Sequence, residues 1–118
     1  MAYHNDRISR HFTKKEATCK CGCGYLRIND VLVQKLEKLR AYLGHKPITI
    51  TSWCRCEKHN KAVGGVPTSN HMTGEAVDIV VKGVSLSNVA FAAESVGFDF
   101  IKTYPKEGFV HVDVRGYK

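Results

Sequence analysis

The sequence lacks the features that mark membrane-spanning, secreted or repetitive proteins. No apolar run approaches the roughly 20 residues of a membrane helix, so we expect no stable membrane insertion. The first twelve residues, MAYHNDRISRHF, have no apolar centre of the kind found in secretory signals. We therefore expect synthesis in the cytoplasm without a signal peptide. No internal repeat or low-complexity segment is present, which argues against a solenoid or fibrous architecture.

Acidic residues are also scarce. There are 11 against 18 lysines and arginines, which gives a formal net charge of +7. Such a balance favours polyanionic partners, including nucleic acid, anionic lipid and an anionic cell wall. The basic residues are scattered, however, and the densest groups, Lys14–Lys15 and the set Lys35, Lys38 and Arg40, form no run. A solvated basic surface is favoured over a nucleic-acid groove, so we expect no nucleic-acid partner.

The five cysteines are an odd number, which argues against a complete disulfide framework. Cys19, Cys21 and Cys23 form one group, and Cys54 and Cys56 form another. A cytoplasmic setting would keep them reduced. Three interpretations stay open: a second, structural zinc site between the groups, a disulfide, or buried thiols. The Cys-x-Cys spacing differs from the usual zinc knuckle, in which two residues intervene.

The length of 118 residues and the apolar fraction of 43% predict one globular domain, which we expect to be monomeric. We expect an irregular arm over residues 1–12 and the domain proper over residues 13–118. A capping box at Thr13 and Glu16 predicts a short helical turn. Apolar residues at three- and four-residue steps predict an amphipathic helix that begins after Asn29 and ends at Gly44.

Alternating and β-branched segments predict strands over residues 47–52, 76–81, 100–104 and 109–114. A short helix over 54–63 and a second long one over 85–96 separate them. Residues 105–108, Pro-Lys-Glu-Gly, predict a hairpin turn between the last two strands. The pattern indicates an α+β fold in which a mainly antiparallel sheet packs against helices.

Polar residues interrupt two of the most apolar predicted strands. Asp78 follows His71 by seven residues and lies among valines and isoleucine, where an ionised carboxylate is costly unless it is paired or binds a metal. In the last strand, His111, Asp113 and Arg115 share one face while valines occupy the other. A histidine that is simply buried, or an aspartate paired with a neighbouring arginine, would explain parts of this pattern.

Two histidines and an aspartate, His71, Asp78 and His111, suit zinc, which takes nitrogen and oxygen ligands at about 2.0–2.2 Å. Three protein ligands leave the fourth position to water, which is the arrangement of a catalytic rather than a structural site. Spacing alone favours zinc only slightly over the structural alternatives.

Four sequence blocks resemble the D-alanyl-D-alanine carboxypeptidase family of zinc peptidases, which includes murein endopeptidases and phage endolysins and shares its fold with the Hedgehog signalling domain. The blocks are TSWCRCEKHN (51–60), VGGVP (63–67), Ser69-x-His71-x-x-Gly74-x-Ala76-x-Asp78, and FVHVDVR (109–115). They occur in the family's order and extend the resemblance from about Phe12 to Arg115. The cysteine segment 19–24 is similar to that of phage-type members.

The resemblance implies zinc ligation by His71, Asp78 and His111, the residues that the spacing also indicates. It gives Arg55 the role of binding the scissile carbonyl or the substrate carboxylate, and a fixed guanidinium can stabilise an oxyanion. Ser69 corresponds to a serine that orients the loop or the substrate.

The general base is the point at which the chain departs from the family. Several relatives carry a carboxylate three residues before the last histidine ligand, and others a histidine two before it; here these positions are Gly108 and Phe109. We rank Asp113 first as the catalytic carboxylate and Glu107 second. Asp113 could equally hold a ligand imidazole in place.

The resemblance implies a zinc metallopeptidase that hydrolyses a peptide bond next to a D-amino acid in peptidoglycan stem peptides or cross-links. Without a signal peptide, we expect a phage-type lysis protein that reaches the wall after holin-type release. The alternatives are a non-catalytic wall-binding module of the same fold and a cysteine-zinc module that binds nucleic acid. The sequence leaves the cleaved bond open, as it does the choice between carboxypeptidase and endopeptidase.

Overall fold

The fold is built around four short antiparallel strands. A computed structural model describes residues 7–115. The strands are β1 (Thr49–Ser52), β2 (Ala76–Val80), β3 (Phe100–Tyr104) and β4 (Phe109–Asp113), in the sheet order β1-β2-β4-β3. All neighbours are antiparallel, so β2 and β4 form the centre of the sheet. The predicted α+β class with an antiparallel sheet is confirmed.

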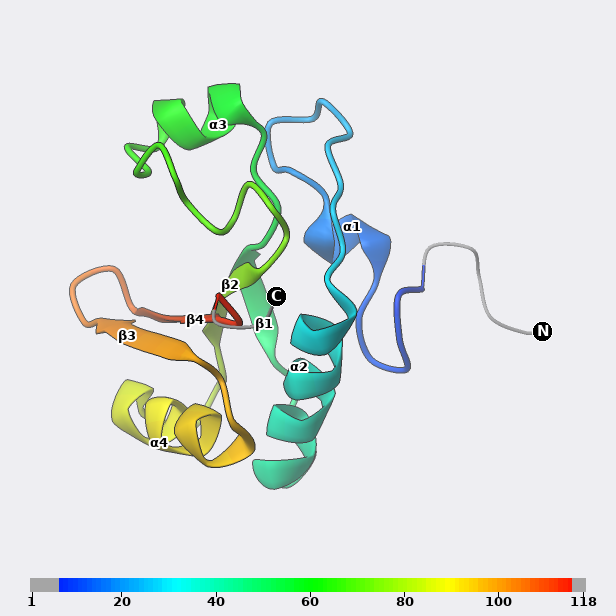
Figure 1. The fold of residues 1–118 in the computed structure, drawn as a ribbon. Coiled ribbons are helices and arrows are strands. Elements are labelled where there is room, and N and C mark those ends of the chain that lie inside the picture. The colour runs from blue at the N-terminus through cyan, green and yellow to red at the C-terminus, as the bar shows by residue number, and fades with distance from the viewer. Residues whose placement is uncertain (1–6, 116–118) are drawn as a thin grey trace.

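Four helices begin at side-chain caps. They are α1 (Lys14–Ala17), α2 (Asp30–Tyr42), α3 (Glu57–Ala62) and α4 (Leu86–Val96), as labelled in Figure 1. The capping box of Thr13 and Glu16 opens α1, and Asn29 caps α2 through a bond from the Leu32 amide. Ser85 caps α4, which ends at Gly97 in the left-handed region. The capping box of Thr13 and Glu16 and the Asn29 cap are the ones that the sequence predicts.

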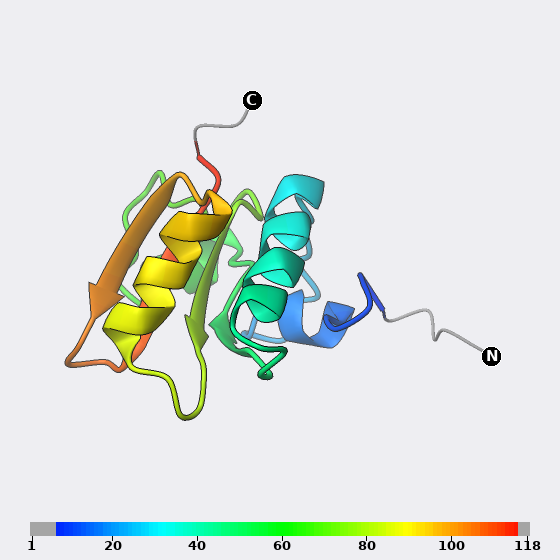
Figure 2. The same ribbon diagram turned by 90° about the horizontal axis from the view of Figure 1, so that it is seen from below.

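The helices lie on both sides of the sheet (Figures 1 and 2). On one side, α4 packs against β3 and β4, with α2 beside it. The buried stripe of α2 and alternate residues of β2 and β4 form the core on this side, namely Leu32, Leu36, Leu39, Val77, Ile79, Val110 and Val112. Figure 1 shows α3 and the loop after it on the opposite side.

Period-two alternation turns the polar residues of the central strands away from this core. The valines of β4 are fully buried in it, whereas His111 and Asp113 occupy the intervening positions. Asp78 alternates in the same way with Val77 and Ile79. One face of the sheet is therefore apolar, and the other carries polar groups beneath the loop that follows α3.

The segment before α1 is anchored to the core. The Phe12 side chain is buried against Trp53, with ring centroids 6.2 Å apart. The Glu37 carboxylate of α2 accepts hydrogen bonds from the Ser9 hydroxyl at 2.6 Å and the His11 amide at 2.9 Å.

The division into an arm, 1–12, and a domain, 13–118, stays a prediction, and residues 1–6 and 116–118 lie outside the described ones. Within residues 7–115 no helix has the length and apolar character that crossing a membrane requires.

Candidate metal centre

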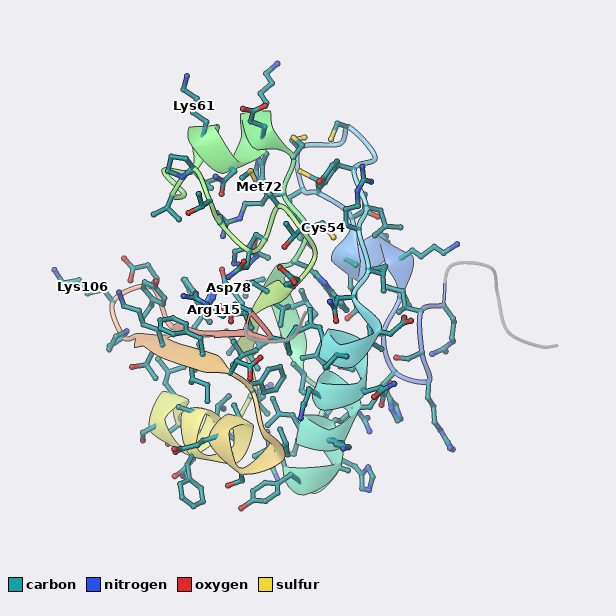
Figure 3. The ribbon with its side chains drawn as sticks, in the orientation of Figure 1. Cys54, Lys61, Met72, Asp78, Lys106 and Arg115 are labelled. Carbon is teal, nitrogen blue, oxygen red and sulfur yellow. The ribbon has the colours of Figure 1, made fainter. Side chains whose placement is uncertain are left out.

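The three predicted metal ligands come together on the polar face of the sheet. Asp78 of β2 and His111 of β4 are direct partners in the antiparallel register. The third, His71, belongs to the loop between α3 and β2 and is 1% exposed. The His71 Nε2 and His111 Nδ1 atoms lie 3.2 and 3.0 Å from the Asp78 Oδ1 atom. Figure 3 shows Asp78 between the sheet and this loop.

Backbone contacts fix the loop that carries His71. Gly74 has a φ of 77°, and a side chain there would collide with the carbonyl group of Arg27. The Arg55 amide donates to the His71 carbonyl at 3.0 Å, and the Ser69 hydroxyl accepts from the His71 amide at 3.2 Å. The position of the imidazole is therefore set by several segments of the chain.

Hydrogen bonds determine which ring nitrogens face inward with a lone pair. His71 Nδ1 lies 2.7 Å from the Trp53 carbonyl, which can only accept, so Nδ1 must carry the hydrogen. His111 Nε2 lies 2.8 Å from the Asp113 carboxylate and must likewise donate. In the neutral rings, His71 Nε2 and His111 Nδ1 then present lone pairs to the Asp78 carboxylate.

Three acceptors that converge on one point require a cation or a shared proton. Tetrahedral zinc with bonds of about 2.0–2.2 Å would place its ligand atoms about 3.3–3.6 Å apart. The observed separations of 3.0 and 3.2 Å are close to that spacing. The chemistry of the donors and their separation therefore fit zinc, with His71, Asp78 and His111 as its ligands.

The ionisation of these groups follows from their mutual contacts. Burial alone would raise the pKa of Asp78, but hydrogen bonds from His111 and His71 outweigh it and the pKa is lowered. Burial alone would lower the pKa of His111, yet its bonds to Asp113 and Asp78 outweigh that and raise the pKa. The site therefore attracts positive charge even before a metal is considered.

Asp113 is fully buried and is held on two sides. Its carboxylate accepts from His111 Nε2 and from the Arg115 amide and guanidinium, at 2.8 to 3.1 Å. Burial alone would raise the pKa of Asp113, but these hydrogen bonds lower it from the usual 3.8 to about 2. The side chain thus stays ionised and orients the His111 ring.

Arg55 approaches the centre from the segment before α3. Its Nη2 atom lies 3.7 Å from the Asp78 Oδ2 atom, and its Nη1 atom donates to the Asn60 side-chain oxygen at 3.0 Å. Burial lowers the pKa of Arg55, and Asp78 opposes that shift. The buried Arg55 Nε atom has no hydrogen-bond partner among the described residues, so the guanidinium retains a free donor.

A cleft of about 440 Å³ contains the centre and both predicted substrate-binding residues, Arg55 and Ser69. Lys102, Tyr104 and Phe109 of the β3–β4 hairpin also line the cleft, although none of them is among the predicted site residues. Asn60 is a second omission: it is buried, and its amide nitrogen donates to the Val66 carbonyl while its oxygen holds Arg55. Glu107 is exposed in the hairpin turn and does not line the cleft.

All five cysteines are free thiols. Four of them, Cys19, Cys21, Cys23 and Cys56, have their sulfur atoms within 4.8 Å of one another. Cys54, which the sequence grouped with them, lies elsewhere, because its sulfur donates to the Arg27 carbonyl at 3.0 Å and accepts from the Arg27 amide at 3.3 Å. The candidate second zinc site therefore contains four of the five cysteines, and its inclusion of Cys54 is wrong.

The solved structure of the L-Ala D-Glu endopeptidase ChiX of Serratia marcescens resembles this fold, with a TM-score of 0.51. It is 18% identical in sequence, and the match covers 76% of this chain and 84% of that one.

Several relatives match in sequence. Peptidoglycan L,D-endopeptidase MepK of Escherichia coli K12 is 33% identical over 92 residues, which is 73% of this chain and 50% of MepK. Zinc D-Ala-D-Ala carboxypeptidase of Streptomyces albus G is 37% identical over 68 residues, 58% of this chain and 27% of that enzyme. The matched part of the chain thus spans 50% of the length of MepK and 27% of the length of the Streptomyces albus G enzyme. A sequence profile for peptidase M15 matches residues 10–113, nearly the whole described chain, and the protein therefore belongs to the peptidase M15 family.

Proposed function

We propose that this protein is a zinc-dependent peptidase that hydrolyses a peptide bond next to a D-amino acid in the stem peptides or cross-links of peptidoglycan. The observation that carries the proposal is the convergence of His71, Asp78 and His111 in a cleft that also contains Arg55. Relatives named as a peptidoglycan L,D-endopeptidase and a zinc D-Ala-D-Ala carboxypeptidase support the substrate class.

Zinc bound at this centre would supply a Lewis acid for the scissile carbonyl and lower the pKa of water. Arg55 lies beside the centre and would stabilise negative charge as it develops on the carbonyl oxygen, or bind a substrate carboxylate. Asn60 holds one arm of the guanidinium at 3.0 Å and leaves the Arg55 Nε donor free. Ser69 supports the ligand loop through the His71 amide and lies where its backbone or side chain can contact a bound peptide.

The two predicted catalytic carboxylates have different environments. Asp113 already accepts hydrogen bonds from His111 and Arg115, and its pKa of about 2 makes it a weak base. We therefore assign Asp113 a positioning role. Glu107 is exposed and makes no hydrogen bond or ion pair within the described chain, so it is the better candidate for proton transfer if the hairpin turn moves over a bound substrate.

One observation favours a second function, that of a non-catalytic wall-binding module. Apart from Asp78, no carboxylate among residues 7–115 lines the cleft. A domain that retains zinc and Arg55 but lacks a proton acceptor would bind peptidoglycan peptides without cleaving them.

Digestion of purified peptidoglycan separates these two functions. We expect release of free amino groups that is abolished by a chelator and by His71→Ala, with mass spectrometry of the fragments identifying the bond. Release of single D-alanine would indicate a carboxypeptidase, whereas division of stem peptides or cross-links would indicate an endopeptidase. Zinc-dependent retention on insoluble peptidoglycan without any cleavage would instead establish the binding module.

The net charge of +7 suits adhesion to an anionic wall. We propose that the protein is made in the cytoplasm and reaches the wall after holin-type release, as a monomeric phage-type endolysin. Lysis that requires co-expression of a holin would support this route. Lysis of equal extent without a holin would contradict it.

A further inference from the structure

The strongest unexplained feature is the cluster formed by Cys19, Cys21, Cys23 and Cys56, which we call the cysteine cluster. It lies where the loop before residue 25 meets the start of α3, and sulfur atoms gather there in Figure 3. The centre formed by His71, Asp78 and His111 shares no residue with it. We propose that the cysteine cluster binds a second zinc ion, with four thiolate ligands and a purely structural role.

The sulfur positions match those of a tetrahedral metal site. Zinc–sulfur bonds of about 2.3 Å imply sulfur–sulfur separations of about 3.8 Å in a regular tetrahedron. The separations are 3.5 Å for Cys19–Cys21, 3.6 Å for Cys21–Cys56 and 3.8 Å for Cys19–Cys56, and Cys23 completes the group within 4.8 Å. A disulfide would require about 2.05 Å, so the sulfurs are arranged around a common point rather than in bonded pairs.

Backbone amides add hydrogen bonds that suit thiolates. The Cys56 amide lies 3.4 Å from the Cys19 sulfur, and the His59 amide lies 3.3 Å from the Cys56 sulfur. Each thiol would release its proton to solvent on binding, so Zn²⁺ and four thiolates leave a net charge of −2. Donors directed at the sulfurs stabilise that charge.

The loop itself has little else to hold it. Residues 20–24 are all exposed, so burial of apolar side chains contributes almost nothing to their position. Local backbone bonds, from the Cys19 amide to the Tyr25 carbonyl at 2.9 Å and from the Gly22 amide to the Cys19 carbonyl at 3.3 Å, close the turn but do not join it to α3. A shared metal would make that connection.

The cysteine cluster is adjacent to the candidate active site along the chain. Cys56 directly follows Arg55, whose amide donates to the His71 carbonyl and whose guanidinium faces Asp78. A metal on Cys56 would therefore cross-link the N-terminal loop to the segment that positions Arg55. With four protein ligands the site has no open coordination position, so it supports folding rather than catalysis.

Zinc stoichiometry in the full-length chain tests the proposal independently of peptidase activity. We expect two zinc ions per chain, and one after His71→Ala. Adding Cys21→Ser and Cys23→Ser to that variant should remove the remaining zinc. Cys54→Ser is the matched control, because serine can keep both bonds to the Arg27 backbone and the cysteine cluster is unchanged.

Cobalt substitution provides a second measurement that does not depend on the folding of any one variant. Cobalt bound to the wild-type chain should show the intense sulfur-to-cobalt charge-transfer absorption of a thiolate site. Separately, removal of metal from the His71→Ala variant should lower the midpoint temperature of thermal unfolding of that variant. One zinc per chain that disappears entirely with His71→Ala would overturn the proposal. Intramolecular disulfides, detected by intact mass under native conditions, would overturn it as well.

Discussion

Replacement of Asp113 by asparagine distinguishes a positioning carboxylate from a general base. The substitution preserves shape, but an amide has one acceptor oxygen where the carboxylate has two. In the native chain one carboxylate oxygen accepts from His111 Nε2 and both accept from Arg115. If the amide oxygen faces His111, the amide nitrogen must face a guanidinium that is also a donor.

The expected loss can be estimated from the geometry. A residue that holds a metal-bound imidazole typically contributes about 10–100-fold to metal affinity. That range corresponds to about 1.4–2.7 kcal/mol. The 2.8 Å bond to His111 and the complete burial of Asp113 support the upper part of the range. We expect zinc affinity to fall accordingly, with peptidoglycan hydrolysis restored once the zinc concentration saturates the variant.

Competition with a chromophoric chelator measures the affinity, and hydrolysis assays across a zinc series measure the recovery. Glu107→Gln is the control, because Glu107 contacts neither His111 nor Arg115; it should leave zinc affinity unchanged and reduce turnover. Asp113→Asn with normal zinc affinity and full occupancy but no turnover would refute the positioning role and identify Asp113 as the base. Unchanged affinity with unchanged turnover would refute both roles.

Three further predictions concern other parts of the molecule. Arg55→Lys should lower kcat/KM by about 10²–10³-fold at unchanged zinc content, because lysine cannot reproduce the guanidinium that Asn60 orients; steady-state kinetics with paired metal analysis checks this. Zinc affinity should fall as pH decreases, beginning above pH 6.5, because the raised pKa of His111 lets protons compete with the metal at higher pH than at an ordinary histidine. Zinc titrations over a pH series measure the affinity. A loss of affinity confined to pH well below 6.5 would contradict the prediction. Glu37→Gln should lower the free energy of unfolding by about 1–3 kcal/mol, because the carboxylate holds the segment before α1 through hydrogen bonds. Urea unfolding of this variant is compared with that of Glu94→Gln, a control at an exposed position. Equal free energies of unfolding for the two variants would refute the prediction.

The regular elements could be predicted because their signals are local. Asn29 caps the first long helix, as the sequence indicates, and the second, Leu86–Val96, lies within the predicted range 85–96. The alternation around Asp78 and His111 predicts a polar face on each strand, since period two is a property of one strand alone. That the two strands are neighbours in register, so that these residues meet, depends on pairing that no local pattern encodes.

What the sequence left unresolved depends on contacts between distant segments. The role of Asn60 comes from a fold that places Arg55 on one side of it and the Val66 carbonyl on the other. The Trp53 carbonyl that orients His71 is a backbone atom, which carries no sequence signature. Cys54 and Cys56 lie two residues apart in the irregular segment between β1 and α3, yet the Cys54 sulfur contacts the Arg27 backbone whereas the Cys56 sulfur lies in the cysteine cluster.

The pairing of Asp78 with His111 across β2 and β4 also limits where this chain can change in length. A one-residue insertion inside either strand would move its ligand to the apolar face and leave the other ligand behind, because neighbouring positions of a strand point to opposite sides. The connection over residues 82–85, between β2 and α4, lines no part of the cleft and is mostly exposed. Added residues should be tolerated there, so homologous chains of different lengths should differ at that connection while the spacing within each central strand stays fixed.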